Sequence, residues 1–180
     1  MKTTYVYTDG SVFNNQRRES LKTFGGIGVF FGDNDSRNIS EPFFAFPVTN
    51  NRTEIYAASK AIDVFMQDKI SKKDDEKELL IIYSDSQYMI NLITKWIHTW
   101  KMKQWTKANG KPVENKDLIY QLDHLINLYK DYIKIEFKFV KAHRKISPKD
   151  PIEYKKWYGN KMADELANRG SIIAMKAMEK

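Results

Sequence analysis

The sequence has no cysteine among its 180 residues, which excludes disulfide bonds, thiolate metal sites and cysteine nucleophiles. Histidine is scarce as well: the three histidines are His98, His124 and His143, and their spacing matches no histidine-based zinc motif. A metal ion bound by this chain is therefore expected to have mainly oxygen ligands.

Long apolar runs are also missing. No stretch approaches the ~18 consecutive apolar residues of a membrane span, and the chain enters its first strand pattern without a leader-like segment. We therefore expect no membrane association and a cytoplasmic location, with a nuclear or viral context as the open alternative, and residues 1–180 forming a single domain. The formal net charge of +7 and the pI near 9.3 favour a polyanionic partner.

Two segments each combine a strand pattern with an acid directly behind it. Residues 4–8 are β-branched or aromatic and predict a strand that stops at Asp9. Residues 79–83 are all non-polar, as in a parallel strand that is covered on both faces, and they are followed closely by Asp85. Because parallel strands bring their carboxyl ends to the same edge of a sheet, we expect the two acids to lie side by side. A shared cation would explain this arrangement.

The remaining patterns predict three further strands and five helices. The strands are expected over residues 24–31, where glycines indicate bulges or close backbone approach, over 39–46, where Pro42 indicates an edge strand, and over 133–140. Helices are expected from about Arg52, over 86–95, 99–106 and 115–130, and from about Asn160, the last with Met162, Leu166, Ile173 and Ala177 on its inner side. Residues 141–157, with Pro148 and Pro151, are expected to be irregular.

Four acids, Asp9, Glu54, Asp85 and Asp164, fall at boundaries of these elements. Three of them have a structural explanation: Glu54 can close a capping box with Asn51, Asp85 can cap the following helix, and Asp164 can favour a helix dipole from the first turn. Four carboxylates that converged without cations would repel one another, whereas bound divalent ions remove that cost. Oxygen ligands favour Mg²⁺ or Mn²⁺ over zinc, and two such ions about 3.5–4 Å apart suit a phosphodiester displacement.

The residues around the four acids resemble the four signature motifs of type 1 ribonuclease H. The resemblance extends from about Thr3 to Gly170, and all four acids are in register with the catalytic acids of the family. The motifs are Tyr7-Thr8-Asp9-Gly10-Ser11, Thr49-Asn50-Asn51-Arg52-x-Glu54-x-x-Ala57-Ala58, Tyr83-Ser84-Asp85-Ser86-Gln87-Tyr88 and Gly159-Asn160-x-x-Ala163-Asp164-Glu165-Leu166-Ala167.

This resemblance implies an α/β ribonuclease H-like fold, with a five-stranded mixed sheet in the order 3-2-1-4-5 flanked by helices. It implies endonucleolytic hydrolysis of the RNA strand of RNA–DNA hybrids, leaving 3′-hydroxyl and 5′-phosphate ends. The four acids are then the ligands of two Mg²⁺ ions, for which Mn²⁺ can substitute. The partner is the hybrid itself, and we expect a monomer without an obligate protein partner.

Residues 94–113 contain five lysines, three tryptophans and no acid. Lysines neutralise phosphates and aromatic faces pack against sugars and bases, although the spacing of Trp105 favours a core position. The segment is similar to the basic protrusion with which the family grips the DNA strand. The residues expected to contact substrate there are Trp96, Trp100, Lys101, Lys103 and Lys107.

The resemblance also implies polar contacts to both strands. Thr49 and Asn115 match two members of a pocket for a DNA-strand phosphate, but Pro47 stands where the family has the pocket's arginine. Three further residues match positions that read the RNA strand near its 2′-hydroxyls, the group that distinguishes RNA from DNA locally. These residues are Asn15, Asn50 and Gln87.

His143 matches the mobile-loop histidine of the family, which assists leaving-group protonation or product release. Asp164 follows it by 21 residues, about twice the usual separation, so residues 145–157 form an insertion. The insertion carries lysines, prolines and aromatics. It can serve as a lid, as an additional substrate contact or as decoration without a role, and the sequence does not choose among the three.

Two alternative functions compete with hybrid hydrolysis. One is a non-catalytic module that binds RNA–DNA hybrids, which the four intact acids disfavour. The other is a different nuclease on the same fold, such as a resolvase or transposase core. That alternative is disfavoured by the tryptophan- and lysine-rich protrusion and by a chain too short for extra domains.

Overall fold

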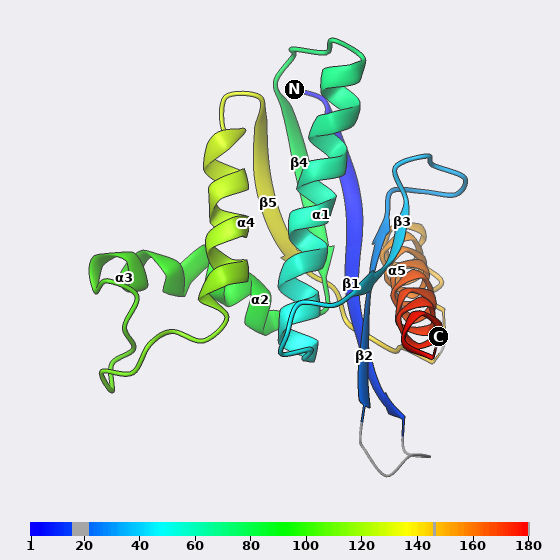
Figure 1. The fold of residues 1–180 in the computed structure, drawn as a ribbon. Helices are drawn as coiled ribbons and strands as arrows, with labels where there is room; N and C mark the ends of the chain where they lie inside the picture. The colour runs from blue at the N-terminus through cyan, green and yellow to red at the C-terminus, as the bar shows by residue number, and fades with distance from the viewer. Residues whose placement is uncertain (16–21, 146, 180) are drawn as a thin grey trace.

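A five-stranded sheet is the centre of the fold (Figure 1). The computed structural model describes residues 1–15, 22–145 and 147–179. The strands lie in the order β3-β2-β1-β4-β5, which confirms the predicted topology, with Pro42 on the edge strand β3. The strands are β1 (Thr3–Asn15), β2 (Lys22–Phe30), β3 (Ile39–Phe43), β4 (Glu78–Ser84) and β5 (Ile133–Phe139).

The central strand β1 changes partners along its length. It pairs in parallel with β4 over Thr3–Thr8 and antiparallel with β2 over Tyr7–Asn15. The prediction that this strand stops at Asp9 is therefore wrong, because the antiparallel pairing continues beyond the last parallel pair, Thr8 with Ser84. Asp9 nevertheless lies where β4 ends, and this places it beside the residue that follows β4.

Helices cover both faces of the sheet, with α1 and α4 on one face and α5 on the other (Figure 1). The helical segments are α1 (Asn50–Ser71), α2 (Gln87–Asn91), the π-helical turn η1 (Leu92–Trp96), α3 (Ile97–Met102), α4 (Lys116–Leu128) and α5 (Pro151–Met178). Alternate residues of β1, β2 and β4 pack beneath α1 and form the main core, which includes Val6, Ile27, Leu80, Ile55 and Phe65. Within the described residues no helix has the length and apolar character needed to cross a membrane.

Helix α5 begins at Pro151, so residues 151–157 are helical, in contrast to the predicted irregular segment and the predicted start near Asn160. The carboxylate of Asp150 accepts hydrogen bonds from the amides of Ile152 and Glu153, at 2.9 and 3.0 Å. Proline suits the first helical position because its missing amide would have no partner there. The acid–proline pair thus starts the helix rather than interrupting it.

The helix predicted over residues 99–106 ends earlier than expected, because α3 stops at Met102. Gln104 and Trp105 have φ angles of 53° and 61°, in the left-handed region that no helix of L-residues can continue through. The chain then crosses to α4 as an extended loop that projects from the sheet together with α3 (Figure 1).

Small residues, rather than the predicted large ones, form the inner face of α5. The buried residues of this helix are Gly159, Asn160, Ala163, Ala167, Gly170, Ser171 and Ala174. The predicted inner residue Ile173 is 45% exposed, Ala177 is exposed, and Met162 and Leu166 are only partly buried.

Glycines on β2 explain this close packing. A Cβ atom on Gly26 would collide with the amide of Ser171, and one on Gly28 would collide with the carbonyl of Ala163. The backbone of α5 therefore lies directly against the strand, which leaves no room for large side chains between them. The predicted close backbone approach at these glycines is confirmed.

Candidate active site

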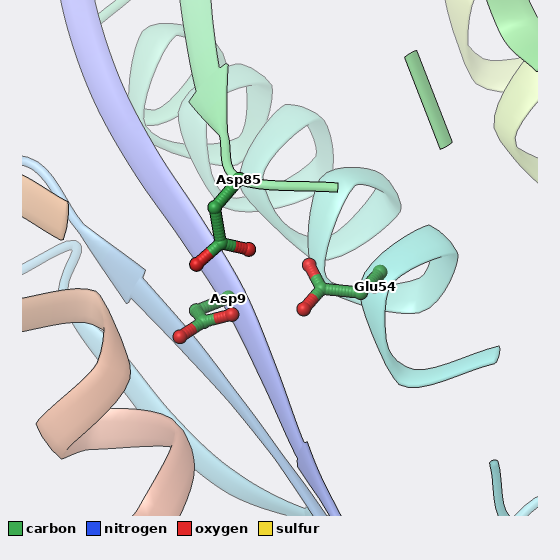
Figure 2. Close-up of side chains that lie close together, drawn as sticks. All are labelled: Asp9, Glu54 and Asp85. Atoms are coloured by element: carbon green, nitrogen blue, oxygen red, sulfur yellow. The ribbon is translucent and has the colours of Figure 1, made fainter. Parts of the chain in front are cut away.

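Three carboxylates converge where β1 and β4 separate (Figure 2). One ligand oxygen from each of Asp9, Glu54 and Asp85 lies within 4.8 Å of the others. Asp9 belongs to β1, Asp85 follows β4 directly, and Glu54 reaches in from the beginning of α1. The prediction that Asp9 and Asp85 lie side by side is confirmed, and Glu54, also expected among the converging acids, lies with them.

Gly10 allows the start of α1 to approach the acids. A Cβ atom at this position would collide with the hydroxyl of Thr53, so only glycine permits the observed contact. The amide of Gly10 donates hydrogen bonds to Asp9 Oδ1 at 2.9 Å and to Glu54 Oε1 at 3.1 Å. The Asp9-Gly10 sequence therefore places one carboxylate and orients a second.

The capping-box explanation of Glu54 is wrong. Thr49 is the N-cap of α1, and its hydroxyl accepts a hydrogen bond from the amide of Arg52 at 3.2 Å, so Asn51 is not a cap. The buried Oε2 atom of Glu54 has no hydrogen-bond partner within the described chain. This carboxylate is thus not required to complete the helix, and it retains an unused acceptor in the acid cluster.

The structural explanations of Asp85 and Asp164 are wrong as well. Ser86 caps α2 in place of Asp85, because its hydroxyl accepts from the amide of Met89 at 3.1 Å. Asp164 lies in the middle of α5 and not in its first turn, so the helix dipole gives no reason for an acid there. Neither acid is therefore explained by the end of a helix.

The cluster is electrostatically strained. Burial raises the pKa of Asp9 far above its ordinary value, and the neighbouring Glu54, Asp85 and Asp164 raise it further. Burial likewise raises the pKa of Glu54. Burial also raises that of Asp85, against a hydrogen bond from Asn160 and the charge of His143, which lower it. Without a proton or a cation, the acids cannot all be ionised at low cost.

The residues present fit a divalent cation. They offer three converging carboxylates, one with an unpartnered buried oxygen, and hard oxygen donors of this kind suit Mg²⁺ and Mn²⁺. Asp164 lies outside the group of three but close enough to affect Asp9, and its carboxylate accepts from Asn168 at 3.3 Å. It can complete the ligand set from α5.

We expect the metal-free protein to lose stability as the pH rises. A carboxyl group whose pKa is raised by folding binds its proton more tightly in the folded state. Its stabilising contribution is therefore full below the unfolded pKa of about 4 and is lost as the pH rises toward the higher folded pKa.

Urea unfolding in EDTA at pH 5 and pH 8 measures the effect. Mg²⁺ at 100 times its Kd should restore about 2.7 kcal/mol at pH 8. Equal stability with and without Mg²⁺ would contradict a cation site.

Two residues from the last third of the chain adjoin the acids. His143 follows β5 with a φ angle of 51° and lines a cavity of about 410 Å³ together with Asn160 and Asp164. The buried Asn160 donates a hydrogen bond from Nδ2 to Asp85 Oδ2 at 3.3 Å. Sequence reasoning missed a role for Asn160, although its position one helical turn before Asp164 was a signal that both face the same site.

Comparison with known proteins identifies the fold and its lineage. The RNase H family model matches residues 1–172. Ribonuclease HI of Haemophilus ducreyi is 37% identical over 172 residues, covering 95% of this chain and 92% of that protein. The chain belongs to the RNase H family.

Solved structures agree at the level of fold. The PFV RNase H domain superposes with a TM-score of 0.65 at 21% identity, covering 94% of both chains. The foamy viral protease-reverse transcriptase, solved in complex with an RNA/DNA hybrid, matches with a TM-score of 0.62 at 20% identity, covering 93% of this chain and 20% of that one.

The protrusion of this RNase H fold is partly anchored in the core. Trp100 and Trp105 pack against the main hydrophobic cluster, which confirms the core position predicted for Trp105, whereas Trp96 is 40% exposed. Two of its lysines are paired with acids: Lys101 with Asp123 at 2.6 Å and Lys107 with Glu114 at 3.3 Å. Lys103 is exposed and has no acidic partner in the described ranges.

The other predicted substrate residues lie at the ends of helices. Thr49 caps α1, Asn50 is its first residue and Gln87 is the first residue of α2. Asn115 precedes α4 with a φ angle of 62°, and its Nδ2 donates to the hydroxyl of Tyr88 at 3.1 Å. The side chain of Asn15 lies outside the described part of the structure.

An ion pair between the buried Arg52 and the exposed Asp117 joins the starts of α1 and α4. Arg52 is only 3% exposed and donates from both terminal nitrogens to the carboxylate of Asp117, at 2.8 Å each. This pairing links the helix starts that carry Thr49 and Asn115. It also occupies Arg52, which therefore does not replace the arginine missing at Pro47.

Proposed function

We propose that this protein is an endoribonuclease that hydrolyses the RNA strand of RNA–DNA hybrids and leaves 3′-hydroxyl and 5′-phosphate ends. The observation that carries the proposal is the convergence of three carboxylates, with an unpartnered buried oxygen on Glu54. A non-catalytic module has no need to maintain such a strained cluster. Membership of the RNase H family, with a relative named ribonuclease HI, supports the same conclusion.

In this proposal Asp9, Glu54, Asp85 and Asp164 hold two Mg²⁺ ions, for which Mn²⁺ can substitute. When bound, such ions stabilise the attacking and leaving oxygens of the phosphodiester displacement. The chain fixes the ligands: the Gly10 amide orients Glu54. His143 lies beside the acids, where its imidazole can hand a proton to the leaving oxygen.

We assign substrate positioning to polar, basic and aromatic residues outside the acid cluster. We assign the DNA strand to the protrusion and to the pocket at the starts of α1 and α4, and the RNA strand to three further polar residues. The protrusion residues are Trp96, Trp100, Lys101, Lys103 and Lys107, the pocket residues are Thr49 and Asn115, and the RNA-strand residues are Asn15, Asn50 and Gln87. The protein would act as a monomer without an obligate partner.

Cleavage assays on matched duplexes test the proposed function. RNA–DNA, RNA–RNA and DNA–DNA duplexes of one sequence are incubated with the protein, with and without Mg²⁺. We expect cleavage of the RNA strand of the hybrid alone, and only with a divalent ion. Hybrid binding without cleavage would favour the non-catalytic module, and cleavage of either other duplex would favour a different nuclease on this fold.

His143→Ala should slow hybrid cleavage by about 10- to 100-fold without abolishing it. The imidazole contributes proton transfer, whereas the acids and their ions supply most of the charge stabilisation. Steady-state rates at saturating hybrid measure the loss, and His124→Ala, which changes an exposed histidine on α4, is the matched control. A His143→Ala enzyme with parental turnover would remove this residue from the mechanism.

A further inference from the structure

A basic cavity of about 410 Å³ opens beside the acid cluster, between the segment that follows β5 and the first turns of α5. Its lining contains four lysine or arginine side chains and His143, with Asp164 as its one acid. The lining residues are Lys141, His143, Arg144, Lys145, Trp157, Asn160, Lys161 and Asp164. Asp164 and Asn160 belong to the active site too, so the cavity and the site share a wall.

The long insertion of this chain contributes Lys145 and Trp157 to the lining of the cavity. Residues 151–157 extend α5 toward its N-terminus and bring Trp157 against the segment after β5. The indole Nε1 of Trp157 donates to the carbonyl of Arg144 at 3.0 Å, and this contact ties the two walls together. The ammonium group of Lys161 lies 5.3 Å from the centre of the Trp157 ring, within range of a cation–π interaction.

The cations of this cavity are largely unneutralised. Among the described residues, Lys141, Lys145 and Lys161 form no ion pair, and Arg144 approaches Glu153 only at 3.9 Å. The lysines of the protrusion at positions 101 and 107 both have acidic partners, as does the buried Arg52. Cations gathered without acids raise the local potential and select an anionic ligand.

We propose that this cavity binds a backbone phosphate of the RNA strand next to the scissile phosphate. The inference rests on the proposed function, because the strand being cleaved must pass the wall formed by Asp164. Ammonium and guanidinium groups supply charge-assisted hydrogen bonds to a phosphate, and Trp157 supplies a flat face against the adjoining sugar or base. Of the three roles open to the insertion, this assigns substrate contact.

Binding measurements on a cleavage-deficient background test the subsite. With Asp9→Asn in every protein, fluorescence anisotropy gives the Kd for a labelled hybrid over a range of salt. Adding Arg144→Ala and Lys161→Ala should weaken binding about 10-fold, and should reduce the slope of log K against log salt by up to about 0.9 for the one phosphate contact. The control pair Lys130→Ala and Lys176→Ala removes the same charge from exposed positions at the ends of α4 and α5.

Neutral phosphates locate the contact. Hybrids carrying one uncharged methylphosphonate at a time in the RNA strand are bound to both variants. The control protein should bind about 10-fold more weakly when the methylphosphonate replaces one phosphate adjacent to the scissile phosphate. For the Arg144→Ala, Lys161→Ala protein, a methylphosphonate at that position should leave the affinity unchanged. Should the Arg144→Ala, Lys161→Ala protein unfold, a variant with Lys141→Gln and Lys145→Gln replaces it. This variant changes exposed side chains, and the expected result is the same.

The possible failures are distinguishable. Should the protein with native Asp9 not cleave hybrids, the proposed function fails and the subsite with it. Should it cleave hybrids while the charge-removed variant binds them like the control, only the subsite is overturned. A lowered turnover number of the charge-removed variant with unchanged Kd and salt slope would also overturn it.

Discussion

Replacing Asp9 with asparagine is expected to reduce hybrid cleavage by at least about 100-fold, with hybrid affinity within about threefold of the parent. Asp9 is central to the acid cluster, since its pKa responds to all three other acids. An amide of the same shape keeps the packing but removes the charge that holds a cation. Affinity should survive because phosphate contacts elsewhere on the protein supply it.

Single-turnover cleavage and anisotropy on the same hybrid measure the two quantities. Asp131→Asn, which changes an exposed acid just beyond α4, is the control and should match the parent in both. Without Mg²⁺, the Asp9→Asn protein should melt at the parental temperature or roughly 2–4 °C above it, the shift that about 1 kcal/mol of relieved repulsion produces. Retention of more than about a tenth of the activity would contradict the metal-ligand role of Asp9.

The position of this cluster was predictable because it depends on local sequence. A strand pattern followed by an acid marks a strand end, and parallel strands bring such ends to one edge. Asp85 was placed correctly for this reason, and Asp9 because the parallel pairing of β1 with β4 ends beside it, although β1 continues past Asp9. The order of the five strands came from the resemblance to the family, not from periodicity.

The features that the sequence did not reveal depend on distant partners. Arg52 and Asp117 are 65 residues apart, and Asn160 and Asp85 are 75 apart, so no local pattern joins them. The early start of α5 was missed for a different reason. A proline inside a helix breaks it, whereas a proline directly after an aspartate favours the first position of a helix.

The inner face of α5 was also missed, because its large apolar residues are only partly buried or exposed while small residues form the buried face. What decides the packing is the absence of side chains at Gly26 and Gly28 on the facing strand β2. Where glycines of a strand face alanines of a helix, direct backbone contact replaces the usual interdigitated side chains. The strongest consequence concerns Gly28, which lies opposite the residue before Asp164.

Gly28→Ala is therefore expected to destabilise the protein by about 3 kcal/mol and to lower the turnover number about 10-fold or more. The new methyl group would collide with the carbonyl of Ala163, and backbone, unlike a flexible side chain, cannot turn away. The helix must shift, and Asp164, the next residue, shifts with it. Displacements of about 1 Å at a catalytic group can cost about 100-fold. The entropy that alanine removes from the unfolded chain offsets only about 0.4–1 kcal/mol.

Urea unfolding gives the stability, and cleavage at saturating hybrid under folding conditions gives the turnover. Gly32→Ala is the matched control, because nothing lies within 4 Å of a Cβ atom built there and its φ is not in the left-handed region. The control should be neutral or slightly stabilised, with parental activity. If Gly28→Ala proved as stable and as active as Gly32→Ala, then α5 would not rest directly on β2, and the placement of Asp164 would have to depend on other contacts.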